Sequence, residues 1–82
     1  MKVKVRRIEA MFVELGDVIV WGKDRLEVYK TRYQSGGLGD SINLSLRNVK
    51  TGDYAESGFL THDCLVEVEL TDAQTRSRLA GR

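Results

Sequence analysis

A short stretch of strict alternation constrains the fold of this chain more than any other feature. Ile42, Leu44 and Leu46 are apolar, and the residue after each of them is polar. A period of two gives a β-strand one dry face and one wet face. Residues 48–52 (Asn-Val-Lys-Thr-Gly) then supply residue types that favour a tight connection between strands. The pattern therefore predicts a β-hairpin whose second strand covers residues 53–60.

Extended segments also precede and follow this hairpin. Further strands are expected over residues 2–6, 18–21, 26–33 and 64–70. Five or six short strands of this kind indicate an all-β fold, a small closed or partly closed barrel. The residues expected in its core are Val18, Val20, Leu26, Val28, Ile42, Leu44, Leu46, Val66 and Val68. Val3 and Val5 are expected to point inward from the first strand, and Trp21 is expected in the core or as a plug at the barrel rim.

The length of 82 residues allows one small domain. Residues 1–70 are expected to form the barrel and residues 71–82 a polar C-terminal tail. Thr71-Asp-Ala-Gln74 has the spacing of a helix capping box. The segment after it offers little apolar surface, and helices below ~12 residues are marginal alone in water. A frayed tail is therefore the first expectation, and a marginal helix is the second.

The formal net charge of +1 is unevenly distributed along the chain. Residues 1–50 contain ten Lys and Arg against six Asp and Glu, whereas residues 51–82 contain three against six. A protein that binds DNA non-specifically usually has a larger basic excess, because its affinity comes from phosphate neutralisation. A solvated charged surface is therefore expected for most of the chain, with room for a local basic face.

Neither a membrane anchor nor an internal disulfide is predicted. Apolar runs such as residues 18–21 are far below the ~20 residues of a membrane helix. The basic N-terminus is not followed by the apolar segment of a secretion signal. Cys64 is the single cysteine. A cytoplasmic protein without a membrane partner is the resulting expectation.

Residues 16–70 resemble the N-terminal domain of bacterial elongation factor P, a KOW-like domain with an SH3-type barrel. Residues 18–28 are similar to the first hairpin of that family, and Gly36-Gly-Leu-Gly39 lies where the family has a glycine-containing loop tip. The best match is residues 44–52, which end in a form of the family's Asn-Leu-x-Thr-Gly turn. Phe59 falls where the family has a Thr-Phe pair. The resemblance implies a small SH3-like (KOW-like) barrel.

The residue that carries the activity of that family has no counterpart here. The family modifies a lysine at the loop tip, but this chain has no lysine between Lys30 and Lys50. The family's loop proline is also missing, and 82 residues leave no room for its two following OB-type domains. The resemblance therefore implies the barrel and not the translation-factor activity.

A binding surface is expected where aromatic and basic residues meet. Tyr29 and Tyr33 flank Arg32 in a group of the kind that stacks on bases in small barrels, and Arg47 would approach phosphates. The two tyrosines share a face unless a bend in the strand changes the alternation. The full expected surface includes the glycine-rich loop and consists of Tyr29, Arg32, Tyr33, Gly36, Gly37, Leu38 and Arg47. An ordinary polar β surface and a flexible hairpin tip at residues 34–41 are the plainer interpretations.

His62-Asp63-Cys64 is the one cluster of reactive side chains. In an extended segment His62 and Cys64 would lie on the same side, as a thiolate–imidazole pair or two metal ligands requires. A turn followed by a half-buried thiol is the plainer interpretation, because the chain has no second His or Cys. The glycine-rich loop has neither the P-loop nor the dinucleotide pattern. No enzymatic activity, cofactor or metal is expected.

Two functions of different classes follow from these features. The first is a small non-enzymatic binding module that associates with RNA, DNA or the ribosome through the Tyr/Arg face and the glycine-rich loop. The alternative is a protein–protein interaction or assembly accessory protein of a phage or bacterium. The first requires binding that weakens steeply with salt, and the second does not.

Overall fold

Six strands and one helix make up most of the computed structural model, which describes residues 3–36 and 39–80. The strands are β1 (Lys4–Glu9), β2 (Val18–Trp21), β3 (Asp24–Gly36), β4 (Gly39–Asn48), β5 (Tyr54–Thr61) and β6 (Leu65–Leu70). A short 3-10 helix, η1 (Ala10–Phe12), follows β1, and the C-terminal helix α1 covers Asp72–Ala80. The segment between β1 and β2 is therefore partly helical.

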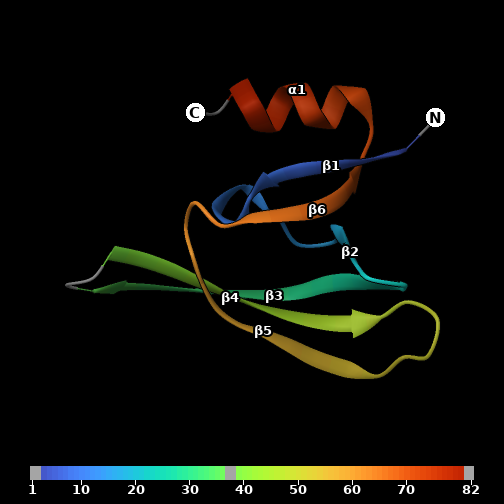
Figure 1. The fold of residues 1–82 in the computed structure, drawn as a ribbon, viewed down its shortest axis with the longest axis horizontal. Coiled ribbons are helices and arrows are strands. Elements are labelled where there is room, and N and C mark those ends of the chain that lie inside the picture. Colours follow the sequence, from blue (N-terminus) through green and yellow to red (C-terminus); the bar gives the residue numbers. More distant parts are fainter. Residues whose placement is uncertain (1–2, 37–38, 81–82) are drawn as a thin grey trace.

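The six strands form one antiparallel sheet in the order β1-β6-β2-β3-β4-β5. β2 to β5 pair with their neighbours in sequence, and β6 inserts between β1 and β2. Figure 1 shows the result, in which β1 and β6 lie above β3, β4 and β5, with α1 at the top of the view. This arrangement confirms the prediction of a small all-β, barrel-like fold of five or six strands.

The core lies between these two layers, and β4 contributes three of its residues, more than any other strand. Its buried apolar residues are Ile8, Ala10, Val13, Ile19, Leu26, Val28, Ile42, Leu44, Leu46, Val68 and Leu70. Six of the nine residues expected in the core are among them, and Val66 packs against them partly buried. The predictions for Val18 and Val20 were wrong, because Ile19 between them is the buried residue of β2. Ile19 lies opposite Leu26 and Val68, both of which are buried.

The inward direction predicted for β1 was also wrong. Val3 and Val5 are about half exposed, and the buried residue of β1 is Ile8. Arg6 lies opposite Val68 and donates a hydrogen bond to Asp72 of α1 at 2.8 Å. A long basic side chain can cover apolar surface with its methylene groups while its charged end reaches a partner. Arg6 therefore lies on the same side of β1 as the buried Ile8.

The turn between β4 and β5 has the structure predicted for it. The Asn48 side-chain oxygen accepts hydrogen bonds from the backbone N–H groups of Lys50 and Thr51, at 2.8 and 3.0 Å. Gly52 has φ of +82°, a conformation that glycine adopts without strain. Its N–H donates to the backbone oxygen of Asn48 at 2.8 Å.

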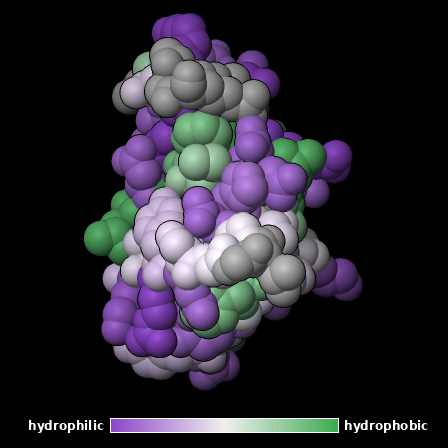
Figure 2. Space-filling view, turned by 90° about the vertical axis from the view of Figure 1, so that its left-hand side faces the viewer, coloured by the Kyte–Doolittle hydropathy of each residue, from purple (hydrophilic) through white to green (hydrophobic). Residues whose placement is uncertain are grey.

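The glycine-rich segment expected to form a long loop is largely strand. β3 and β4 stay paired up to Gly36 and Gly39, so residues 34–36 and 39–41 belong to the hairpin. The predicted flexible tip is thereby reduced to Gly37 and Leu38, which lie outside the described residues. Seen from the end toward which this hairpin points, the surface is mostly hydrophilic, with small separate hydrophobic patches (Figure 2).

The β3–β4 pair and the β4–β5 pair each contain one irregularity. In β3 the register shifts between Val28 and Lys30, so Tyr29 has no counterpart on β4. In β5 the shift lies between Glu56 and Phe59, where Gly58 has φ of +74°. An extra residue in one strand reverses which side its later residues face. The bend that would change the alternation after Tyr29 is therefore present.

Residues 72–80 form the helix that was the second expectation for this segment. The capping box predicted at its start is confirmed: the Thr71 hydroxyl accepts from the Gln74 N–H at 3.2 Å, and the Gln74 side-chain oxygen accepts from the Thr71 N–H at 2.8 Å. These reciprocal bonds satisfy backbone donors that a helix start otherwise leaves free.

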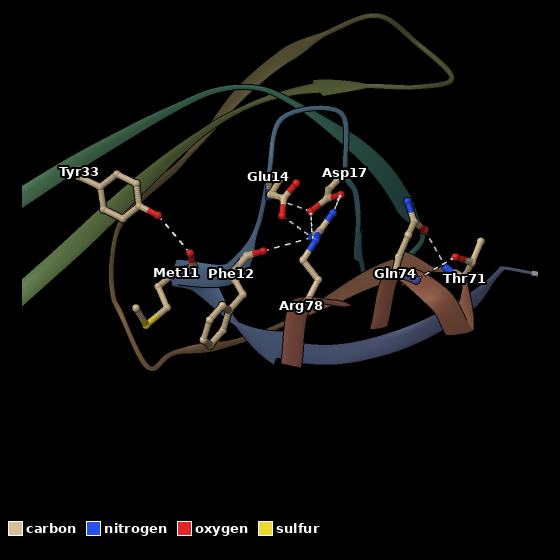
Figure 3. Close-up of polar contacts among 8 residues, drawn as sticks. All are labelled: Met11, Phe12, Glu14, Asp17, Tyr33, Thr71, Gln74 and Arg78. Atoms are coloured by element: carbon tan, nitrogen blue, oxygen red, sulfur yellow. Dashed lines mark hydrogen bonds and ion pairs between the residues drawn. The ribbon is translucent and has the colours of Figure 1, made fainter. Parts of the chain in front are cut away.

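Arg78 attaches α1 to the barrel (Figure 3). Its side chain is only 10% exposed, and its guanidinium donates two hydrogen bonds to the buried carboxylate of Asp17, at 2.6 and 2.9 Å. It also contacts a carboxylate oxygen of Glu14 at 2.9 Å and the backbone oxygen of Phe12 at 3.1 Å. The hydrogen bonds to Asp17 raise the pKa of Arg78 above its usual value. These contacts give a short polar helix the tertiary support that its own sequence does not supply.

Candidate nucleic-acid interface

One side of β3, β4 and β5 points away from the core and carries aromatic and basic side chains. Residues opposite one another in an antiparallel pair point to the same side, and Ile42, Leu44 and Leu46 define the buried side of β4. The opposite side, here called the outer face, contains Glu27, Tyr29, Lys30, Arg32, Asn43, Ser45, Arg47, Tyr54, Glu56 and Phe59. Three strands therefore contribute to one continuous surface.

The aromatic part of the outer face comes from β3 and β5. The rings of Tyr29 and Tyr54 lie 5.4 Å apart at 79°, an edge-to-face pair. Tyr54 is 70% exposed, Phe59 50% and Tyr29 46%. Aromatic rings exposed to this extent are available for stacking on planar partners. Sequence reasoning missed Tyr54 and Phe59, although both follow from the hairpin register once the irregularity in β5 is known.

The basic part of the outer face consists of Lys30, Arg32 and Arg47, all exposed. Arg47 lies opposite Tyr54 on one side and Glu27 on the other, and Arg32 lies opposite Asn43. Within the described residues these three side chains form no ion pair, whereas Arg6, Arg25 and Arg78 each do. The cations of the outer face therefore keep their charge uncompensated by a direct contact.

Tyr33 does not belong to this face, although the sequence placed it there. It lies opposite Ile42, so it points to the buried side of the sheet, beyond the end of the core. Tyr33 is 61% exposed, and its hydroxyl donates to the backbone oxygen of Met11 at 3.0 Å (Figure 3). The shift at Tyr29 is the cause. The expected surface of Tyr29, Arg32, Tyr33 and Arg47 is thus divided between two sides.

The glycine-rich hairpin end adjoins both sides of the sheet. Gly36 lies opposite Gly39, the last pair that the structure describes, and both are exposed. Gly37 and Leu38, the other expected binding residues, lie outside the described ranges.

The middle of the outer face holds a polar cluster around Glu56. The carboxylate accepts hydrogen bonds from the Ser45 hydroxyl, with oxygens at 2.8 and 3.1 Å, and from the Asn43 amide at 3.1 Å. Ser45 is buried beneath it. The cluster joins β4 to β5 at the point where the β5 register shifts, and it sets the direction of an exposed carboxylate between the aromatic residues.

A separate apolar cleft opens between β2 and β6. The two strands pair only through Val18 with Glu69 and Ile19 with Val68, and they diverge beyond these pairs. The cleft has a volume of about 380 Å³, and its lining includes Val20, Trp21, Leu60, Leu65 and Val66. Trp21 was expected in the core or as a plug at the barrel rim. It is 52% exposed and lines the cleft, so the first of these two positions is wrong.

The predicted reactive cluster is spread along an exposed turn. The His62 ring lies near the backbone oxygen of Asp40, with Nδ1 at 3.4 Å, and the thiol of Cys64 is partly buried. Among the described residues, no group of three or more His, Cys, Asp or Glu side chains is placed to hold a metal ion. No helix in residues 3–36 and 39–80 is long and apolar enough to cross a membrane.

Comparisons with known proteins gave no match. The chain matches no protein-family model, no curated protein and no solved structure.

Proposed function

We propose that this protein binds single-stranded nucleic acid through the outer face. The observation that carries the proposal is the Tyr29–Tyr54 ring pair, exposed beside three cations that no carboxylate contacts within the described residues. Aromatic rings stack on bases of any sequence, and arginine and lysine set the path of the phosphates. The resemblance to a KOW-like domain of a translation factor is consistent with such a role and remains a prediction.

Stacking has to supply most of the affinity on this surface. Lys30, Arg32 and Arg47 are offset in part by Glu27 and Glu56, so the excess of positive charge on the outer face is small. Each stacked base contributes about 1–3 kcal/mol. Three phosphate contacts would give a slope of about −2 for the logarithm of the binding constant against that of the salt concentration.

Tyrosine variants on the two sides of the sheet test the proposal. We expect Tyr54→Ala to weaken the binding of a labelled single-stranded RNA, about 12 nucleotides long, by about ten-fold, measured by fluorescence anisotropy at low salt. Tyr33→Ala is the matched control, because Tyr33 is similarly exposed but points to the other side. It should change binding less than two-fold, about the scatter of such a measurement. Absence of binding by the wild-type protein, or equal loss in both variants, would refute the proposal.

The apolar cleft favours a second candidate function, binding of a protein partner. Exposed tryptophan beside Leu65 and Val66 is the kind of group that anchors protein interfaces. Pull-down from nuclease-treated and untreated lysate separates the two candidates. A partner retained after nuclease treatment and lost with Trp21→Ala would favour the cleft, whereas capture lost on nuclease treatment and with Tyr54→Ala would favour the outer face.

A further inference from the structure

We infer that Glu56 recognises a guanine base when single-stranded nucleic acid lies on the outer face. This inference rests on the proposed function and adds a base preference to it. Stacking and phosphate contacts are largely indifferent to sequence. A carboxylate fixed in the middle of such a surface distinguishes between bases, because it accepts hydrogen bonds and cannot donate them.

The hydrogen bonds that fix Glu56 leave part of its capacity unused. Two carboxylate oxygens offer about four acceptor positions. The Ser45 hydroxyl lies near both oxygens but has one hydrogen to donate, and Asn43 supplies a second donor. About two acceptor positions therefore remain for a ligand. Since Glu56 is exposed, a ligand can reach them.

The surroundings of Glu56 suit a stacked base. Tyr54 lies two residues before it on the same face, and Phe59 follows on that face because of the extra residue in β5. A base that stacks on either ring turns its edge toward the space between them. The carboxylate at that position can then read the Watson–Crick edge, as proteins commonly do with unpaired bases.

Guanine is the base whose donors match a carboxylate. Its N1–H and N2 amino groups are adjacent donors that can bond to both carboxylate oxygens at once. Cytosine and adenine present one amino donor beside a ring-nitrogen acceptor, and uracil presents its N3–H between two carbonyl oxygens, which repel a carboxylate. A well-placed bidentate contact discriminates against the wrong base by roughly ten-fold.

Inosine provides a direct test, because it lacks only the N2 amino group of guanine. We would measure binding of RNAs with UG, UI and UA repeats, each about 12 nucleotides long, in lithium buffer to avoid quadruplexes. The wild-type protein should bind the UG repeat about ten-fold more tightly than the other two. Glu56→Gln, which replaces one acceptor oxygen with a donor, should bind all three equally. Glu27→Gln, on the same face, should keep the preference.

The outcomes separate this inference from the proposed function. Equal binding of the three RNAs by the wild-type protein, or a guanine preference that survives Glu56→Gln, would overturn the role of Glu56 and leave the proposed function standing. Absence of binding to any RNA would overturn both. Should Glu56→Gln fail to fold, equal binding of the UG and UI repeats by the wild-type protein would still overturn the inference.

Discussion

Arg78 and Arg47 show two different uses of arginine in one small chain. Arg78 is nearly buried and directs its guanidinium at Asp17, Glu14 and a backbone oxygen, all of which hold α1 against the barrel. Arg47 is exposed on the outer face beside Tyr54 and contacts no carboxylate within the described residues. The contrast teaches that a count of basic residues says little about binding, because only cations without a partner remain available to a ligand.

Breaking the Arg78 contact should have the largest effect on stability. Arg78→Met leaves the buried Asp17 carboxylate without its counter-charge, and removing one partner of a buried ion pair costs about 3–5 kcal/mol. A small domain has little more than this in total. Urea unfolding followed by circular dichroism measures the loss. Arg76→Met, exposed on the same helix, should stay within about 0.5 kcal/mol of the wild type. Equal midpoints for the two variants would show that the ion pair does not support the fold.

Substitutions on the two sides of β4 should differ almost as much in their effect on stability. Leu44 is fully buried, and Leu44→Ala should lower the free energy of unfolding by about 2–5 kcal/mol through the cavity that it leaves. Arg47→Ala, three residues later on the outer face, should change it by no more than about 0.5 kcal/mol. Both values come from the same urea titration. A large loss for Arg47→Ala would mean that the outer face is needed for folding, which would undermine the contrast with Arg78.

Arg25 and Glu69 form an intermediate case, with a smaller effect that depends on pH. Two hydrogen bonds of 2.8 Å join the half-exposed guanidinium to the Glu69 carboxylate. The hydrogen bond from Arg25 lowers the pKa of Glu69 below its ordinary value of 4.5, although burial acts in the opposite direction. A carboxyl group whose pKa is lower in the folded state stabilises the fold above its unfolded pKa, and this contribution is lost as the pH falls through the folded value.

Thermal unfolding between about pH 6 and pH 3 checks this sign, since the window contains the ordinary carboxyl pKa. The wild-type melting temperature should fall more steeply over that range than the melting temperature of Glu69→Gln, which cannot titrate at this position. Glu67, on the same strand, forms no ion pair within the described residues, so Glu67→Gln serves as the control. Parallel curves for the wild type and Glu69→Gln would show that the pair contributes nothing.

The sequence predicted the parts of the fold in which periodicity was informative. Alternation in β4 correctly placed Ile42, Leu44 and Leu46 inside, and the Asn48 turn followed from residue chemistry. The apolar run of β2 has no alternation, so it could not show that Ile19 is the buried residue. Similarly, nothing local to residues 71–82 indicates that Arg78 meets Asp17, because that contact joins distant parts of the chain.

The sequence predicted the kind of surface at the candidate site but not all of the residues that form it. Exposed Tyr and Arg residues on β3 and β4 were expected, and Tyr29, Arg32 and Arg47 do share a face. Tyr33 was misplaced because an irregular residue in a strand leaves no reliable mark in a single sequence. Tyr54 was missed because its partner across the sheet depends on the register of β5. Both errors arise from the geometry between strands, which local patterns do not encode.

The unpaired residue at Tyr29 determines which residues of β3 face the core on either side of it. Val28 before it and Thr31 after it both point to the buried side, because the extra residue resets the alternation between them. Deleting Tyr29 would remove the irregularity and leave Thr31 facing the core and Arg32 facing solvent, because Lys30 would then alternate regularly with Val28 and Thr31. Deleting one residue from the regularly paired stretch between Thr31 and Gly36 would instead exchange the two sides for the residues beyond the deletion. Length changes in the regularly paired part of this strand are therefore far more restricted than in the 48–53 turn, where the chain can lengthen without exchanging the two sides of the sheet.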